Sequence, residues 1–483
     1  MTEREIELCK MQNDQVPQEE MIRIRRLVAD TKRFVEMYSL LPGMREQLDA
    51  DFDGFLKEHD LAVDEEGMKL LCYEDYKEER ERVQNAPNKL ELLPESVFRF
   101  NQFLANKLAF RDKMIDELCK PTNDRMARWR DRQSNRCLAG VGGINKSFVH
   151  SPFTVELDLG CSVGCDFCGL GAGKLTKIFR HTEENAALFC DILSAAHRLI
   201  GPAAGFGTLY LATEPLDNPD YEQFEADYLK EFGFIPQITT AVADRNIERT
   251  RRLIHELDTT PGYIHRFSVR SLEMAETIFR EFTPLELLRV ELLPQYQEAP
   301  SFVDFTVVGA QAEKVDPDQA RDLDPGTICC ADGFVVNMAE KSIRIITPCH
   351  MTEQFPNGIS EPCKRYFDTA AECEEIMKEM LEEYMIVDLP GDEPLSFYSF
   401  LKRCQTEHGD SLKSTYGGSI LALDKLPKSY AKRVVDLIGE GKYDKREIVR
   451  TIEAEYGAQP ADVFWLLNQL WKQGYIFDRK LFG

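Results

Sequence analysis

The sequence predicts a mixed α/β fold, with a helical domain before it and a small helical domain after it. Three observations predict this order. Amphipathic helical patterns fill residues 1–150, short apolar runs alternate with helical patterns over residues 151–350, and helical patterns with one short strand return over residues 411–483. Strands that alternate with helices indicate a mostly parallel sheet.

Length and charge limit the function classes before any motif is considered. The chain has 483 residues, which predicts about three domains. Lys and Arg total 59 against 83 Asp and Glu, a formal net charge of −24. Such a surface repels phosphate backbones, so nucleic-acid binding is disfavoured. No apolar run approaches the roughly 20 residues that cross a bilayer, and the N-terminus is too polar for a signal peptide. We expect a cytoplasmic protein without a membrane partner.

The first domain, residues 1–150, has the pattern of a helical bundle. Residues 21–38 place apolar side chains at helical spacing, among them Ile24, Val28 and Phe34. A Pro-Gly break at 42–43 precedes another amphipathic segment, and residues 95–119 form a further one with little Gly or Pro. Nothing in this domain predicts catalysis.

The central domain, residues 151–350, has strand-like runs that begin at about residues 153, 208, 236, 264 and 288. Helical segments such as EENAALFCDILSAAHRLI and RNIERTRRLIHEL lie between them. Each strand with its crossover therefore spans a few tens of residues, as a βα unit requires. A full or partial α/β barrel is the expected fold. Near its end, FVVNM and IRIIT are predicted to pair as a hairpin across the AEKS turn.

Residues 351–410 contain a helical pattern at 366–384 and then VDLPGDEPLS, an acidic break that predicts a linker. Residues 411–483 show three helical patterns and a short GYIFD strand, which is typical of a winged helix. This last domain carries 12 Lys and Arg against 9 Asp and Glu, so its charge is +3 and that of the preceding 410 residues is −27. A basic module on an acidic chain indicates an acidic or polyanionic partner.

Three of the 14 cysteines form the most informative motif in the chain. Cys161, Cys165 and Cys168 have the spacing Cys-x3-Cys-x2-Cys directly after a predicted strand. Three thiolates can bind an iron–sulfur cluster and leave one metal position open for another ligand. Zinc is the alternative, but it needs a fourth ligand, and His150 and His181 lie eleven residues before and thirteen after the motif. The many glycines around the cysteines indicate a loop and argue against a packed core.

On these residues the sequence resembles the radical SAM superfamily, whose motif has this cysteine spacing and an aromatic residue before the third cysteine, here Phe167. The resemblance implies a radical SAM barrel, with a [4Fe-4S] cluster on the three cysteines and S-adenosylmethionine (SAM) on the open iron. It also places the cluster loop after the first barrel strand, at the end where such barrels carry their active sites.

Two later segments extend the resemblance. LYLATEPLDNPDY lies where the superfamily has a Gly-Gly-Glu-Pro-like segment, so Thr213 and Glu214 resemble the contacts to the SAM amino group, although Ala212 and Thr213 replace the glycines. RFSVRSLE offers Ser268 and Arg270 where the superfamily often has polar contacts to the SAM ribose or carboxylate.

A closer resemblance, to the radical SAM epimerases that act on ribosomally made peptides of the proteusin (PoyD-like) type, covers most of the chain. The matching segments are WRDRQSNRC, HSPFTVELDLGCSVGCDFCG, YLATEPLDNPDYEQF, PQITTA with RNIERTRRL, HRFSV, TICCADGFVVNM and ITPC, in that order. This sequence departs from the family at Asp166, where Trp is common, and at Asp332, where Ser-Gly-Phe is usual.

The epimerase resemblance implies an isomerase that converts L- to D-residues in a precursor peptide. A 5′-deoxyadenosyl radical removes Hα, and a cysteine returns hydrogen to the opposite face. The implied donor is Cys330, in Cys-x-x-Gly-Phe, with Cys329 and Cys349 as rivals. Adjacent cysteines on a strand point to opposite faces, so at most one of Cys329 and Cys330 faces the barrel mouth. A flavodoxin- or ferredoxin-type protein is the implied reductant.

The remaining cysteines divide into two groups. Cys349, Cys363 and Cys373 are spaced loosely enough that a second iron–sulfur cluster stays an alternative. The others are assigned to packing: Cys9, Cys72, Cys119, Cys137, Cys190 and Cys404.

The C-terminal domain resembles the leader-recognition modules of peptide-modifying enzymes, which add the leader as a strand to a sheet edge. A DNA-binding winged helix and a purely structural cap are the alternatives for this domain. For the whole chain, the alternatives are a radical SAM enzyme that forms thioether or carbon–carbon crosslinks, and a non-catalytic iron–sulfur or zinc scaffold.

Overall fold

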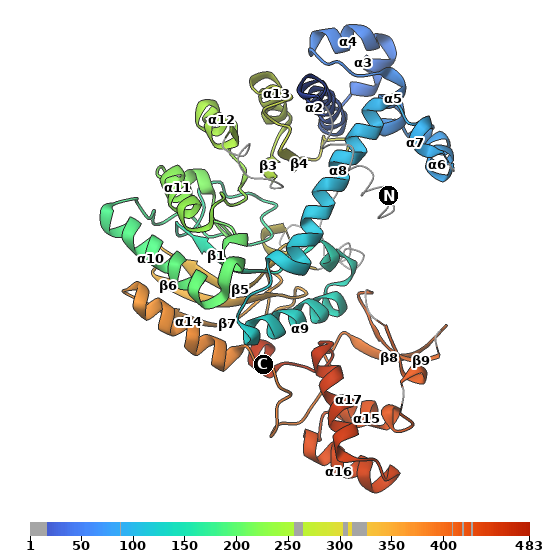
Figure 1. The fold of residues 1–483 in the computed structure, drawn as a ribbon, viewed down its shortest axis with the longest axis vertical. Helices are drawn as coiled ribbons and strands as arrows, with labels where there is room; N and C mark the ends of the chain where they lie inside the picture. Colours follow the sequence, from blue (N-terminus) through green and yellow to red (C-terminus); the bar gives the residue numbers. More distant parts are fainter. Residues whose placement is uncertain are drawn as a thin grey trace. The chain divides into compact units, whose positions relative to one another are not determined.

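The computed structural model describes residues 17–483, apart from residues 87, 256–263, 303–307, 312–325, 408, 418–419 and 427 (Figure 1). The described chain divides into two compact units. Unit 1 comprises the described residues of Met1–Lys113, Glu214–Leu216 and Phe234–Asp304, and unit 2 those of Met114–Thr213, Asp217–Gly233 and Phe305–Gly483. The units are interleaved along the chain, so the expected domain boundaries at residues 150, 350 and 410 stay predictions.

Unit 1 begins with the predicted helices. Helix α2 (Gln18–Leu40) contains the expected segment 21–38 and buries Val28, Phe34 and Met37, which confirms the helical pattern. The other N-terminal helices are α3 (Met44–Ala50), α4 (Phe52–Glu58), α5 (Glu65–Cys72), α6 (Lys77–Asn85), α7 (Lys89–Leu92) and α8 (Glu95–Lys113). Asp51 and Asp64 accept backbone N–H groups at the starts of α4 and α5, as N-cap residues do.

The other part of unit 1 is a small parallel sheet. Strands β2 (Thr239–Thr240), β3 (His265–Val269) and β4 (Val290–Pro294) lie in the order β2-β3-β4, and both pairs are parallel. Helix α12 (Ile247–His255) follows β2, and α13 (Leu272–Glu281) follows β3. Buried Phe267, Val269 and Ile278 belong to the apolar core that joins sheet and helices. Because the strands are parallel, their carboxyl ends meet at one edge.

Unit 2 is built on a four-stranded sheet in the order β1-β5-β6-β7. The strands are β1 (Ser151–Glu156), β5 (Ala331–Asn337), β6 (Ser342–Pro348) and β7 (Ile359–Tyr366). Strands β1 and β5 are parallel, and the other two pairs are antiparallel. The pairing of β5 with β6 confirms the predicted hairpin. Helix α14 (Ala370–Tyr384) confirms the helical pattern predicted at 366–384 from residue 370 onward, while Tyr366 ends β7. It packs on β6 and β7 and contacts α10 (Glu183–Ile200) (Figure 1).

The prediction of a strand from about residue 208 is wrong, because residues 208–212 form bends and irregular backbone and do not pair as a strand. The segment does pass beside β1, where Val155 N–H donates to the Thr208 carbonyl. Its next link is to a side chain, since Ala212 N–H donates to Glu156 Oε1. A side chain at Gly207 would collide with the Phe153 carbonyl oxygen. Two hydrogen bonds, and not a regular series of backbone pairs, therefore attach the segment to β1.

Unit 2 also contains α9 (Asp124–Gly140) and α11 (Tyr221–Phe232), with short helical turns at Met114–Leu118, Gly142–Ser147, Gly201–Phe206 and Gly309–Gln311. A further turn, Pro215–Asp217, begins in unit 1 and ends in unit 2. Asn123 caps α9 by accepting the Met126 N–H, and α9 contacts β5. This contact packs α9 against the four-stranded sheet through β5.

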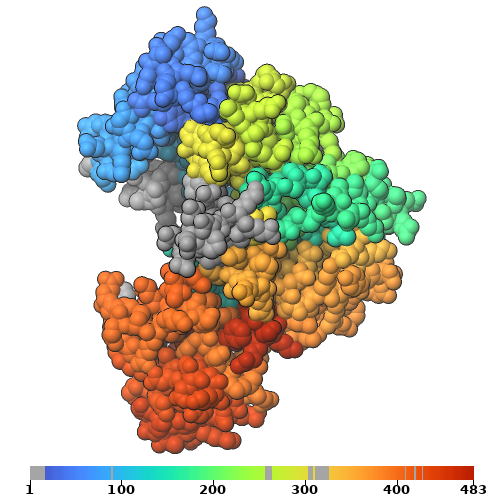
Figure 2. Space-filling model, turned by 180° about the vertical axis from the view of Figure 1, so that it is seen from behind, coloured from blue at the N-terminus to red at the C-terminus, as the bar shows by residue number. Residues whose placement is uncertain are grey.

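The segment that follows α14 forms the orange to orange-red lobe in Figure 2. It contains an antiparallel sheet of β8 (Leu401–Thr406), β9 (Gly409–Ser414) and β10 (Ile420–Ala422). The predicted three helical patterns are confirmed as α15 (Ala431–Glu440), α16 (Lys445–Tyr456) and α17 (Pro460–Lys472). The GYIFD strand is reduced to one bridge between Ile476 and Phe397. Helix α18 (Arg479–Phe482) ends the chain against β7.

The fold is thus mixed α/β, as predicted. The described strands form three separate sheets, and none of the three closes into a barrel, so the expectation of a full barrel is wrong for the described chain. Among the described residues, no helix is both long and apolar enough to span a membrane.

Candidate functional site

The three predicted ligand cysteines lie in one loop that follows β1. Backbone hydrogen bonds close the base of this loop: Leu159 N–H donates to Lys177 O at 2.9 Å, and Cys161 N–H donates to Gly173 O at 2.8 Å. Gly160 has φ +86° and approaches the Lys174 carbonyl so closely that a side chain would not fit, which explains the glycine before the first cysteine. The loop is therefore an ordered excursion with fixed ends.

A side-chain anchor fixes the loop on the other side. Ser162 donates twice to the Asp217 carboxylate, from its backbone N–H at 2.7 Å and from its hydroxyl at 2.5 Å. Asp217 is the last residue of the segment LYLATEPLD, so these two bonds tie the cysteine loop to the segment in which the resemblance places contacts to SAM. Sequence reasoning missed Asp217, and its only signal is its place in that segment, three residues after Glu214.

A buried carboxylate holds the strand that leads into the loop. Asp158 Oδ1 accepts from Phe179 N–H at 3.1 Å and from the Asn218 amide at 2.8 Å. Burial raises the pKa of Asp158 to about 6, and the nearby Asp217 carboxylate adds to this rise. The Asp158 carboxylate therefore joins the end of β1 to Phe179, which follows the cysteine loop, and to Asn218, the neighbour of Asp217.

The three cysteines line one cavity of about 630 Å³, which lies in the size range of cofactor and ligand sites. Each of the three side chains is partly exposed. The other walls are Gly309 and Ala310, which approach Cys168 through an Ala310 N–H bond to its carbonyl, and residues 351–357 after β6. The cavity residues that sequence reasoning missed are Gly164, Gly171, Ala172, Gly309, Ala310, Met351, Thr352, Glu353, Pro356 and Asn357.

The donor set fits an iron–sulfur cluster. Three thiols from one loop open into the same cavity, and Val163 N–H donates to Cys161 Sγ at 3.4 Å. Backbone N–H groups directed at cysteine sulfur are the kind of contact that tunes such clusters. Phe167 lies between the second and third cysteines and is half-buried.

Two predicted SAM contacts, Glu214 and Arg270, both bond to the backbone of Ala241 in unit 1. The Glu214 carboxylate accepts the Thr240 hydroxyl at 2.6 Å and the Ala241 N–H at 2.9 Å. The Arg270 guanidinium donates to the Ala241 carbonyl at 2.5 Å. Glu214 is buried and Arg270 is half-buried. Both therefore lie at the carboxyl edge of the parallel sheet, held by the chain that leaves β2.

The other two predicted SAM contacts, Ser268 and Thr213, do not share this anchor at Ala241. Ser268 is half-buried on β3 opposite Leu293. Thr213 is half-buried and belongs to unit 2, although its chain neighbour Glu214 belongs to unit 1. The three ligand cysteines and Phe167 also lie in unit 2. The structure thus groups the predicted site residues into two sets, one in each unit.

The cysteine pair before β5 is divided between two environments, as the adjacent positions predict. Cys329 is 1% exposed and packs with Ala331 and with Leu170 of the cysteine loop. Burial raises its pKa strongly. Cys330 is exposed, and its carbonyl accepts the Ser151 N–H at the start of β1. Among the cysteines in the described part of the chain, Cys330 is the one with an exposed side chain.

The other cysteines are less accessible. Cys349 is buried after β6, Cys363 is in β7, and Cys373 is buried in α14, so the candidate second cluster would draw its ligands from three elements. Burial raises the pKa of Cys349 and Cys373 to about 12. Of the cysteines assigned to packing, Cys119 and Cys137 are fully buried, Cys72, Cys190 and Cys404 are partly buried, and Cys9 lies outside the described residues.

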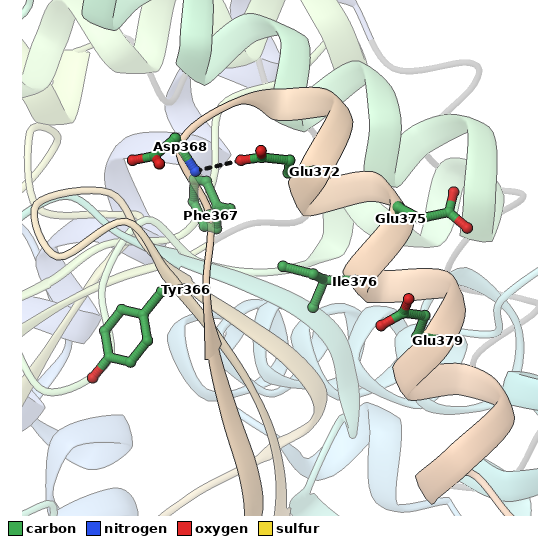
Figure 3. Close-up of a pocket in the computed structure, with 7 residues that line it drawn as sticks. All are labelled: Tyr366, Phe367, Asp368, Glu372, Glu375, Ile376 and Glu379. Carbon is green, nitrogen blue, oxygen red and sulfur yellow. Dashed lines mark hydrogen bonds between the residues drawn. The ribbon is translucent and has the colours of Figure 1, made fainter.

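A second hollow, of about 420 Å³, lies between the end of β7 and α14 (Figure 3). Three of its four carboxylates already have structural partners: Glu372 accepts the Thr369 N–H in a capping box and also the Asp368 N–H, Glu375 pairs with Lys378, and Glu379 pairs with Arg365. It contains no cysteine or histidine. The cysteine-lined cavity is therefore the stronger candidate site.

Comparison with known proteins gives one informative relative. The chain is 30% identical over 467 residues to "Uncharacterized protein y4wI" of Sinorhizobium fredii (strain NBRC 101917 / NGR234), a match that covers 94% of this chain and 88% of the relative. The chain matches no protein-family model and no solved structure.

Proposed function

Because the chain belongs to the family of the Sinorhizobium fredii protein y4wI, whose name states no activity, we propose a function from the site itself. The proposal is a radical SAM epimerase that converts L- to D-residues in a ribosomally made peptide. The observation that carries it is the set of three thiols, Cys161, Cys165 and Cys168, that line one cavity. The fold that goes with this function is a partial radical SAM barrel formed by the βα units of residues 151–294.

The cysteines would hold a [4Fe-4S] cluster through three of its irons and leave the fourth iron for SAM. When bound, the cluster and SAM supply the radical that removes Hα from the peptide. The loop contributes its placement, because its backbone closure and the Ser162–Asp217 bonds fix the thiols before any ligand arrives.

Glu214 and Arg270 would bind SAM by their resemblance to the superfamily contacts, together with Thr213 and Ser268. Their support is the shared anchor at Ala241, which pre-orients a carboxylate and a guanidinium at one sheet edge. A carboxylate suits the SAM ammonium group and a guanidinium suits its carboxylate.

Cys330 is the proposed hydrogen donor. The S–H bond breaks, the hydrogen atom forms the new Cα–H bond on the face opposite to the abstraction, and a thiyl radical stays on sulfur. One electron and one proton from a flavodoxin- or ferredoxin-type reductant return the thiyl to a thiol. A donor must meet both a peptide and this reductant, and the exposed Cys330 satisfies that requirement better than the buried Cys329 and Cys349.

The C-terminal lobe would bind the leader of the precursor. It offers a small antiparallel sheet with two edge strands, β8 and β10, and an extended peptide can add to such an edge. The substrate residues would then reach the cavity through a flexible core segment.

The test is anaerobic reconstitution followed by iron counting and detection of 5′-deoxyadenosine after addition of dithionite and SAM. We expect about four irons per chain and SAM cleavage, and D-residues in a co-expressed precursor peptide. Cys161→Ala should remove both the iron and the cleavage, whereas Cys190→Ala, a partly buried cysteine in α10, should keep both. SAM cleavage by the Cys161→Ala chain would refute the proposal.

A further inference from the structure

A second candidate metal site lies outside the cysteine loop, and we propose that Cys137, His150 and Asp332 bind a divalent transition-metal ion of the zinc type. The three residues come from the end of α9, the residue before β1, and β5. One ligand atom of each lies within 4.8 Å of the other two, and all three side chains are buried. This inference does not depend on the proposed epimerase activity.

Both ring nitrogens of His150 face an oxygen atom, Nε2 that of Asn145 and Nδ1 that of Asp332. The Asn145 amide nitrogen donates to the Ser134 carbonyl, so its oxygen faces His150 Nε2 at 3.0 Å. Nε2 therefore carries a hydrogen, and Nδ1 faces Asp332 Oδ2 at 2.9 Å. A metal ion that binds here would accept one lone pair from Nδ1 and one from the Asp332 carboxylate.

The Asp332 carboxylate supplies a second, independent sign of a missing ligand. Its Oδ1 is fully buried and has no hydrogen-bond partner among the described residues. A buried carboxylate oxygen without a partner is costly. A metal ion would satisfy this oxygen and would also bind the Cys137 sulfur. That thiol donates to the Pro348 carbonyl at 3.4 Å and accepts from the Arg136 guanidinium at 3.1 Å.

The surroundings hold the three ligands in place. Arg130 is buried and donates to the carbonyls of His150 and Val149, at 2.7 Å each. His150 itself has φ +49°, a conformation that non-glycine residues seldom adopt. Strain of this kind is kept where the surrounding structure fixes a functional group. Asn145 then has the role of the outer partner that a metal-bound histidine needs on its other ring nitrogen.

The ligand types select the metal. Thiolate, imidazole and carboxylate together match zinc, with cobalt as its spectroscopic substitute, and they are too soft a set for magnesium or calcium. Three protein ligands leave one tetrahedral position for water or an exogenous group. Binding releases the Cys137 proton and leaves the Arg136 charge beside the thiolate, where it stabilises the sulfur.

The experiment measures metal content independently of the cysteine loop. The full chain is produced in zinc-supplemented medium, both as wild type and as the triple variant Cys161→Ser, Cys165→Ser, Cys168→Ser, which lacks the loop thiols. We expect about one zinc per chain in both. Replacement by Co²⁺ should give a sulfur-to-cobalt charge-transfer band in the triple variant, because Cys137 is then the ligand sulfur.

Variants of the three residues, made in the triple variant, identify the ligands. Asp332→Asn, which preserves size, should lower cobalt affinity by about 10- to 100-fold, and Cys137→Ser should remove the charge-transfer band. The matched control is Cys119→Ser, since Cys119 is an equally buried cysteine of the same unit and should keep metal and band. Circular dichroism establishes that each chain is folded.

Two results would overturn the inference. One is a folded triple variant without zinc or a cobalt band, which would mean that a proton alone bridges His150 and Asp332. The other is a band that survives Cys137→Ser and disappears with Cys119→Ser. Loss of iron and SAM cleavage in the triple variant is expected in either case, so failure of this inference and failure of the epimerase proposal are distinguishable.

Discussion

At the scale of single residues, exposure separates the cysteines into those that can meet a substrate and those that pack. Cys330 is the exposed one among the described cysteines, while its neighbour Cys329 is buried against the loop residue Leu170. A sequence shows that two adjacent cysteines face different ways, but it does not show which side is covered. That depends on where residue 170, more than 150 positions away, comes to pack.

The first prediction concerns Cys330. In an active enzyme, Cys330→Ala should keep 5′-deoxyadenosine formation, because the loop cysteines are unchanged. It should reduce D-residue formation at least 100-fold, because no thiol returns hydrogen on the opposite face. Mass spectrometry of precursor made in deuterated water measures the outcome, since each returned hydrogen appears as one deuterium.

Cys329→Ala is the matched control for this prediction, since it removes the neighbouring buried thiol and should keep D-residue formation. Normal deuterium incorporation by Cys330→Ala, together with its loss in Cys329→Ala, would assign the donor to Cys329 instead.

A second prediction at this scale uses the raised pKa of Asp158. Burial raises its pKa to about 6 from the ordinary value of 3.8. The folded chain therefore binds this proton more tightly than the unfolded chain does. The stabilising contribution of Asp158 is therefore full below about pH 4 and is lost as the pH rises through 6. Asp158→Asn keeps an Oδ1 acceptor for Phe179 and Asn218 and mimics the protonated state.

We expect Asp158→Asn to raise the free energy of unfolding at pH 7 by at most about 3 kcal/mol, and the difference from wild type to shrink toward zero near pH 4. Denaturant unfolding at several pH values measures it. A difference that is constant over this range would contradict a raised pKa at Asp158.

At the scale of elements, the spacing of apolar and turn residues predicted those helices and strands that depend on local sequence alone. Helix α2 and the β5–β6 hairpin follow from spacing and turn residues, and both are as expected. The run at 208–212 has the composition of a strand but is fixed by a bond to the Glu156 side chain. Strand β7 and the turn at His150 depend on distant partners, β6 and Arg130, which no local pattern encodes. The place of the cysteine loop directly after a strand was predicted, whereas its anchor Asp217 and the cavity walls that residues 351–357 supply were not.

The third prediction concerns the anchor of the cysteine loop. Asp217→Ala removes both bonds to Ser162. The loop should still bind a cluster but release iron about 10- to 100-fold faster. This is the size of effect seen when residues that orient metal ligands are lost. Iron release to a chelator, followed by absorbance, measures this rate.

Asp220→Ala serves as the control for the loop anchor, because Asp220 is a carboxylate in the same segment that holds Arg180 and His181. Equal iron-release rates in Asp217→Ala and wild type would show that the backbone closure of the loop suffices.

At the scale of the whole molecule, charge is distributed unevenly. Residues 411–483 have a charge of +3 and the rest of the chain −27. Exposed cations of this region include Lys442, Arg446 and Arg450 on or next to α16. An acidic peptide would be repelled by most of the chain and attracted to this lobe. The charge distribution therefore gives the lobe a physical reason to be the docking module of an acidic leader.

The last prediction follows from this asymmetry. Binding of a fluorescently labelled precursor to the full chain should weaken several-fold between low and physiological salt, because the Debye length shortens to about 8 Å. The triple variant Lys442→Glu, Arg446→Glu, Arg450→Glu should weaken it further and lose most of the salt dependence, whereas Lys113→Glu, an exposed cation at the end of α8, should change neither. Fluorescence anisotropy measures the affinity. Equal binding by the triple variant and wild type would move leader recognition away from the charged surface of the lobe and leave its sheet edges, β8 and β10, as the place to test.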